Sequence, residues 1–275
     1  MNTRFTHSPG ETAQMDTAHL RDQFLVTGLM VDDAVNMVYS HYDRMIIGGA
    51  KPVLNPVSLP VPGELKAESF LERREIGIIN VGGKGSVNVD GETYELNKLD
   101  CLYIGKGAGQ VSFSSVGSGP AVFYFLSAPA HHTYPTSLLT RENASPVKLG
   151  SPETSNERTI YKYIHKDGIK SCQLVMGLTL LEKGSVWNSV PPHTHTRRME
   201  VYFYFDLGAD QRVFHFMGEP RQTRHLLVSN LEAVISPPWS VHFGCGTANY
   251  GFIWGMAGEN QEFTDMDGVK ITELE

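Results

Sequence analysis

Several features are scarce in this 275-residue sequence, and each absence narrows its class. The chain has three cysteines, Cys101, Cys172 and Cys245, an odd number without paired spacing, so neither a disulfide framework nor a cysteine-based zinc site is indicated. No apolar run approaches the length of a membrane span, and the first residues lack the hydrophobic core of a signal peptide. We therefore expect a cytoplasmic protein with no membrane partner.

Basic residues are also too few for a protein that binds nucleic acid. The sequence has 23 Lys and Arg against 30 Asp and Glu, a formal net charge of -7. This balance provides no positive surface for a phosphate backbone. It does nothing to attract an acidic small molecule either, so individual Arg or Lys side chains would have to hold any carboxylate.

Short apolar stretches that alternate with turns are abundant instead. They fill residues 75–126 and again 159–254, and many short strands at even spacing favour a sandwich or barrel over an α/β fold. Asp90-Gly91 predicts a tight hairpin, because this pair supplies the positive φ that a primed turn needs. Helical patterns occur only near the N-terminus, after Asp16 and over residues 32–42.

Four potential metal ligands stand out in the second half of the chain. Successive side chains of a strand point to opposite faces, so His193 and His195 would look the same way. Glu200 begins an apolar, strand-forming run, and His242 follows another apolar run. Three imidazoles and one carboxylate form a ligand set that suits zinc, manganese or iron(II).

The order of these residues resembles the metal motif of the cupin superfamily, whose fold is a double-sheet β-barrel. The wider sequence is similar to one family, the 5-keto-4-deoxyuronate isomerases of pectin breakdown, over nearly the whole chain. This similarity is carried by Tyr163-Ile-His, Lys170-Ser-Cys-Gln-Leu, Gly184-Ser-Val-Trp-Asn, Pro191-Pro-His-Thr-His, Arg197-Arg-Met-Glu-Val-Tyr, Phe214-His-Phe-Met-Gly-Glu-Pro, Ile235-Ser-Pro-Pro-Trp-Ser, Trp254-Gly-Met-Ala-Gly-Glu-Asn-Gln and Asp265-Met-Asp.

An internal duplication is also indicated. Setting Glu75 against Glu200 aligns the strands that follow each of them. The first copy has no His-x-His before Glu75, and Gln110-Val111 stands roughly where His242 falls. We therefore expect an all-β bicupin of two cupin-type double-sheet barrels with a few short peripheral helices. Residues 1–145 would form the N-terminal helices and a metal-free barrel, and residues 146–275 a metal-binding barrel.

The resemblance implies an aldose-ketose isomerase that converts 5-dehydro-4-deoxy-D-glucuronate, a small acidic sugar, to 3-deoxy-D-glycero-2,5-hexodiulosonate. It implies one divalent metal per chain, zinc or alternatively manganese, and a homo-oligomer, a hexamer. A proton would leave C2 and another would reach C1 through an enediol. A metal held by His193, His195, Glu200 and His242 could bind the C1 and C2 oxygens as a Lewis acid.

Two catalytic residues are predicted beside these ligands. A carboxylate bound to a cation is a poor base, so Glu200 is not assigned that role. Strand alternation places Arg198, Tyr202 and Tyr204 on the face of Glu200. A Tyr, foremost Tyr202, or a metal-bound hydroxide could relay the proton, and Arg198 could clamp the substrate carboxylate. Structural roles for these residues stay open, and His215 is expected on the opposite barrel face.

Two other classes of function fit the same ligand set. A cupin dioxygenase would use it with iron(II) or another redox metal, and oxygen uptake would identify that activity. A non-enzymatic bicupin would use a closed zinc site to tie strands together, with no free coordination position.

Overall fold

The computed structural model describes all residues from 1 to 275 and divides into two compact units. We call them the first unit and the second unit. The first unit comprises Met1–Thr3, Gly28–Ala144 and Tyr163–Val175, and the second comprises Arg4–Thr27, Ser145–Lys162 and Met176–Glu275.

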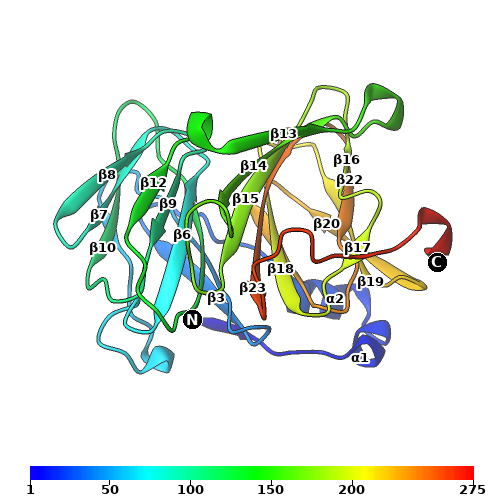
Figure 1. Cartoon of the computed structure of the whole chain (residues 1–275), viewed down its shortest axis with the longest axis horizontal. Helices are drawn as coiled ribbons and strands as arrows, with labels where there is room; N and C mark the ends of the chain where they lie inside the picture. Colours follow the sequence, from blue (N-terminus) through cyan, green and yellow to red (C-terminus); the bar gives the residue numbers. More distant parts are fainter. The chain divides into compact units, whose positions relative to one another are not determined.

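Two antiparallel sheets make up the first unit, in which β6, β9 and β12 lie side by side (Figure 1). The seven-stranded sheet has the order β1 (Asn2–Arg4), β3 (Val35–Ser40), β4 (Ile46–Ala50), β11 (Phe123–Pro129), β6 (Arg74–Asn80), β9 (Cys101–Ile104) and β12 (Ser137–Leu139). The four-stranded sheet has the order β5 (Val57–Ser58), β10 (Val111–Ser115), β7 (Gly85–Val89) and β8 (Glu92–Leu96). Short 3-10 turns cover Gly63–Leu65 and Arg141–Asn143.

The core of the first unit is apolar. In β7, buried Val87 and Val89 alternate with half-buried polar residues, the period of two expected for a strand with one face inward. Phe113 of β10 packs against Phe123 and Phe125 of β11, with ring centroids 5.3 and 6.3 Å away. Burying each such ring stabilises the unit by roughly 1.5–3 kcal/mol.

Of the two local expectations for the first unit, one is confirmed and one is wrong. Asp90 and Gly91, with φ of 50° and 95°, join β7 to β8 in the expected hairpin. Residues 32–42 contain a strand and no helix, because Val35 to Tyr39 pair with β4. The β-branched and aromatic residues of β3 fit a pleated sheet, and cross-strand pairing outweighs the weak helical pattern.

The second unit repeats this arrangement. Its seven-stranded sheet has the order β13 (Ser145–Leu149), β14 (Arg158–Ile164), β15 (Val175–Leu181), β23 (Gly251–Gly258), β18 (Arg198–Phe205), β21 (Glu232–Ser236) and β2 (Leu25–Val26). Its four-stranded sheet has the order β16 (Trp187–Asn188), β22 (Phe243–Gly246), β19 (Val213–Glu219) and β20 (Gln222–Val228), and β17 (His193–Thr194) pairs with β24 (Asp267–Gly268). Short 3-10 turns cover Pro152–Thr154 and Ile271–Glu273. The predicted all-β class is confirmed.

The helices α1 (Pro9–Ala13) and α2 (Thr17–Phe24) belong to the second unit, so the expectation that they belong to the first is wrong. Asp16 caps α2 as expected, its carboxylate accepting from the His19 amide at 2.8 Å. The chain then runs directly into β2, where Leu25 pairs with Val234 of β21. This strand pairing ties α2 to the second unit. No helix is long and apolar enough to cross a membrane.

Candidate active site

The four side chains predicted as metal ligands come together inside the second unit. His193 lies in β17, Glu200 in β18, and His242 just before β22. His193 Nε2 is 3.1 Å from the Nε2 atoms of both His195 and His242. Glu200 Oε2 is 3.1 Å from His195 Nε2 and 2.8 Å from His242 Nε2. Their donor atoms all lie within 4.8 Å of one another, so one small ion could reach all four.

These spacings fit a divalent metal. Nitrogen and oxygen ligands bind zinc at about 2.0–2.2 Å, so two ligands at right angles on one ion stand about 3 Å apart. The measured separations of 2.8–3.1 Å have this size. His195, Glu200 and His242 are buried, which excludes bulk water as the partner of their donor atoms.

The backbone presents the correct nitrogen atoms to the centre of the cluster. His195 Nδ1 donates to the carbonyl of Asp265 at 2.7 Å, and His242 Nδ1 donates to the carbonyl of Ser240 at 3.2 Å. A proton on Nδ1 leaves the lone pair on Nε2, the atom that faces the cluster. The two imidazoles are thereby held in the tautomer that binds a metal.

The charge state of the cluster also suits a cation. Burial alone would raise the pKa of Glu200, but the adjacent imidazoles of His242 and His195 lower its pKa below the usual range. Burial, together with the charge of His242, lowers the pKa of His193. An ionised carboxylate beside a neutral imidazole is the state that metal binding requires.

The cluster opens into a cavity of about 220 Å³ in the second unit. This volume is below the roughly 300–1,000 Å³ of pockets for drug-sized ligands, so the cavity suits a small metabolite. Its wall is mainly apolar and aromatic, with a few polar groups. The lining residues are Leu149, Arg158, Ile160, Thr179, Ser189, Val190, Pro191, His193, His195, Glu200, Tyr202, Phe252, Trp254, Met256, Phe263 and Met266.

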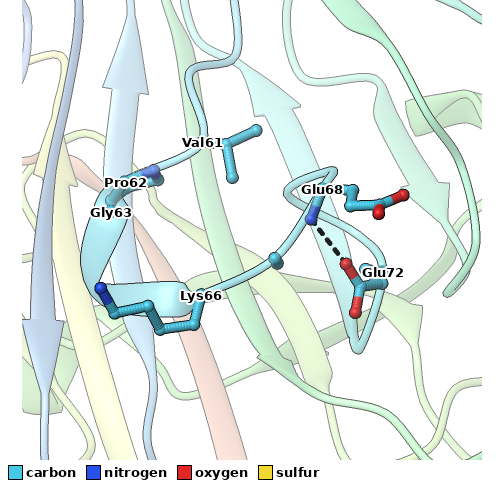
Figure 2. A pocket seen from close by; sticks show the side chains of 7 residues that line it. Val61, Pro62, Gly63, Lys66, Glu68 and Glu72 are labelled. Atoms are coloured by element: carbon cyan, nitrogen blue, oxygen red, sulfur yellow. Dashed lines mark hydrogen bonds between the residues drawn. The ribbon is translucent and has the colours of Figure 1, made fainter.

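A larger hollow, of about 780 Å³, lies in the first unit but does not coincide with this chemistry. Figure 2 shows Lys66 on one side of it and the pair Glu68 and Glu72 on the other. The Glu68 amide donates to Glu72 at 2.6 Å, so one of its two acids already has a protein partner. The hollow is open, its charged residues are largely exposed, and it contains no cluster of three ligand residues. We therefore assign the candidate site to the smaller cavity.

The two predicted catalytic residues have different surroundings. Tyr202 lines the cavity, and its Oη lies 2.7 Å from Ser189 Oγ. Arg198 is fully buried and does not line the cavity, because its Nη2 lies behind His195 and donates to the carbonyl of Asp265 at 2.9 Å. Its Nε and Nη1 have no hydrogen-bond partner and are closed off from solvent. This position argues against Arg198 as a carboxylate clamp.

Two of the polar residues on the cavity wall, Ser189 and Arg158, were not predicted from the sequence. Ser189 adopts a φ of 51°, unusual for a residue other than glycine, and points its hydroxyl at Tyr202. Arg158 is the first residue of β14. The two-residue period of a strand predicts that Arg158 and Ile160 share one face of β14. The local sequence does not indicate that this face lines the cavity.

The expectation for His215 is wrong. It is fully buried, and its Nδ1 lies 2.8 Å from Tyr204 Oη. Phe214, the preceding residue of β19, is 38% exposed instead. His215 therefore faces the interior of the second unit, where Tyr204 and Tyr202 make that interior polar enough to accept an imidazole.

A C-terminal segment, residues 259–268, borders the site. Arg197 donates from Nε and Nη2 to the carboxylate of Asp265, and Nη2 also reaches Asp267 at 3.0 Å. β24 pairs with β17, which brings Gly268 opposite His193. The segment therefore holds the Asp265 carbonyl against His195 and places Met266 on the cavity wall.

Fold and site together define an all-β protein of two repeated units with a single cluster of three histidines and one glutamate. Among solved structures, an IolB-like protein from Salmonella typhimurium LT2 shares this fold with a TM-score of 0.73. The match covers 90% of this chain and 96% of that chain at 13% identity, so it shows the fold alone.

The chain belongs to the KduI/IolB family, whose model matches residues 25–271. A protein from Halalkalibacterium halodurans named 4-deoxy-L-threo-5-hexosulose-uronate ketol-isomerase is 58% identical over 275 residues, covering all of both chains. A protein of the same name from Shouchella clausii is 54% identical over the same length. The family resemblance seen in the sequence is confirmed.

Proposed function

We propose that this chain is a 4-deoxy-L-threo-5-hexosulose-uronate ketol-isomerase, which moves the carbonyl of an acidic sugar from C1 to C2. Full-length relatives of this name support the activity. The observation that carries it at the level of structure is the convergence of three imidazoles and one carboxylate on a cavity of about 220 Å³. A cavity of this size suits a single sugar acid.

His193, His195, Glu200 and His242 would hold one divalent metal ion, with zinc proposed and manganese the alternative. When bound, the ion would supply Lewis-acid polarisation of the substrate's C1 and C2 oxygens without redox change. The imidazole–carbonyl bonds to Asp265 and Ser240 keep the ligands oriented.

Tyr202 and Ser189 are proposed to stabilise the enediol. Burial raises the pKa of Tyr202 well above its usual value, so the phenol keeps its proton at neutral pH. Tyr202 Oη can therefore donate a hydrogen bond to an oxygen on which negative charge develops, while it accepts one from Ser189 Oγ, 2.7 Å away. The wall offers no other neutral hydroxyl pair of this kind.

The remaining predictions are part of the same proposal. They are the role in pectin degradation, a cytoplasmic location, assembly as a hexamer, and a metal-free first barrel. The four clustered ligands all lie within residues 146–275, which supports the prediction that this part of the chain binds the metal.

The test is incubation of the metal-loaded protein with the 5-keto-4-deoxyuronate, followed by NMR of the product carbonyl. We expect the C1 aldehyde signal to be lost and a C2 ketone to appear without oxygen uptake. Oxygen consumption coupled to product would instead identify a dioxygenase. Absence of any product with full metal occupancy would leave only a structural metal site.

A further inference from the structure

We infer that Arg158 binds the carboxylate of the sugar substrate and makes the cavity selective for acidic over neutral sugars. The identity of the sugar rests on the proposed function, but the preference for a carboxylate follows from the cavity itself. No permanently cationic side chain other than Arg158 lines this cavity.

Arg158 has donors to spare. Its Nη1 donates to the carbonyl of Asn156 at 2.9 Å, and the guanidinium makes no ion pair and no other hydrogen bond. A guanidinium has five N–H donors in a planar fork that matches a carboxylate. The half-buried Arg158 therefore offers unpaired donors to whatever occupies the cavity.

An unpaired cation against this wall is costly unless a ligand supplies the negative charge. Ile160, Phe252 and Trp254 are among the neighbours on the wall, and partial burial lowers the pKa of Arg158. An arginine keeps its charge at neutral pH even so. Glu200, the acid on the same wall, is in contact with His195 and His242 and forms no ion pair with Arg158.

The other basic residues close to the site are already engaged. Arg198 donates to the Asp265 carbonyl and lies behind His195, outside the cavity. Lys162, two alternations further along β14, stands 5.4 Å above the Phe263 ring in a cation–π contact. Arg197 is paired with Asp265 and Asp267. Arg158 is left as the carboxylate receptor.

The sheet places this receptor at a suitable separation from the metal cluster. β15 and β23 lie between β14, which carries Arg158, and β18, which carries Glu200. Three strand spacings put the two backbones roughly 14 Å apart. The long arginine side chain takes up part of that distance, and the remainder has the scale of a six-carbon acid whose carbonyl and carboxylate lie at opposite ends.

Arg158→Met tests the inference because it keeps most of the side-chain volume and removes the charge. With the uronate substrate we expect kcat/KM to fall about 10- to 100-fold, mainly through KM, the usual loss for a hydrogen-bonded charge. With the analogue that has a C6 hydroxymethyl group in place of the carboxylate, we expect less than about threefold change. Arg158→Lys should recover part of the loss. Arg221→Met, at an exposed position outside the cavity, is the control.

Calorimetry separates this inference from the proposed function. The probes are D-galacturonate and D-galactose, added to the metal-loaded wild-type and Arg158→Met proteins. We expect wild type to prefer the acid and the variant to bind both sugars alike, whether or not the protein is an isomerase. Equal binding of both sugars by wild type, or a preference for the acid that survives in Arg158→Met with metal content unchanged, would overturn the inference.

Discussion

Two glutamates occupy matching strands of the two units and have different partners. Glu75 lies in β6 and Glu200 in β18, and each strand sits between two equivalent neighbours, β11 and β9 or β23 and β21. The carboxylate of Glu200 lies within 4.8 Å of the ligand atoms of three imidazoles. Glu75 accepts hydrogen bonds from the backbone N–H groups of Cys172, Gln173 and Leu174 at 2.7–2.8 Å and from the Tyr103 hydroxyl at 2.8 Å, all within the first unit.

A buried carboxylate at this strand position can therefore find its partners in two ways. A carboxylate has about four acceptor sites, and in Glu75 four protein donors use them. In Glu200 the only donors are histidine nitrogens that can exchange their protons for a cation. The same strand position therefore supports chain packing in one unit and a candidate metal site in the other.

The interiors of the two units also differ in polarity. The core of the first unit is a cluster of aliphatic side chains that also contains Phe113, Phe123 and Phe125. In the second unit Tyr204 contacts His215, and Tyr250 Oη accepts from Asn188 Nδ2 at 2.7 Å. The Tyr204 hydroxyl and the His215 imidazole pack beside Tyr202 and make that interior more polar than the apolar cluster of the first unit.

The largest expected effect comes from removing one of the imidazoles, which surround Glu200 but not Glu75. His242→Ala should reduce bound metal from about one ion per chain to nearly none and lower kcat by about a thousandfold or more, since several kcal/mol of Lewis-acid stabilisation are lost. Metal analysis and the NMR assay measure both. His225→Ala, at an exposed histidine on β20, is the control. Full metal occupancy in His242→Ala would exclude the proposed ligand set.

The second effect separates the catalytic hydroxyl from the structural one. Tyr202→Phe should lower kcat by about 10²-fold with metal retained, the usual loss of one oxyanion donor. Tyr250→Phe removes a buried hydroxyl outside the cavity and should cost about 1–2 kcal/mol of stability while leaving kcat nearly unchanged. Equal kcat values for Tyr202→Phe and wild type would rule out the role proposed for Tyr202.

Much of the site could be predicted from local sequence, because its ligands follow strand rules. The two-residue period predicts His193 and His195 on one face. Glu200 begins an apolar run that forms most of β18, and His242 follows an apolar run that forms β21. Arg158 escaped prediction because β15 and β23 separate its strand from β18, and no local pattern records that arrangement. Arg198 shares the alternation of Glu200, but the packing of residues 259–268 closes it off from the cavity.

The fold shows a similar limit. The strands and the Asp90-Gly91 turn could be predicted from the sequence, because the residues that determine them are close together in the chain. Residues 32–42 were misread because pairing with β4 decided their conformation. The assignment of α2 to the second unit depends on Leu25 pairing with Val234, more than 200 positions away, which local patterns do not encode.

A third, smaller effect concerns the first unit and leaves chemistry untouched. Glu75→Gln should lower the free energy of unfolding by about 1–3 kcal/mol, because either orientation of the amide sets its NH₂ group against a backbone N–H. The midpoint in urea measures the loss. Metal content and kcat should match wild type, and loss of metal in this variant would mean that the wrong unit was assigned the metal.

The smallest expected effect comes from Arg197, which holds the Asp265 side chain and so helps to fix the Asp265 carbonyl. Arg197→Met removes the donors to the Asp265 carboxylate, and because Arg197 is 36% exposed we expect less than about 1 kcal/mol of lost stability. The loosened carbonyl would hold His195 Nδ1 less firmly, and changes of this kind weaken metal binding about 10-fold or more. Here Arg198 still donates to the same carbonyl at 2.9 Å, so the loss should stay near the lower end of that range. Competition with a chelator measures it, with Arg221→Met as control. An unchanged affinity would mean that Arg198 alone orients His195, and the double variant with Arg198→Met would then be the one to lose metal.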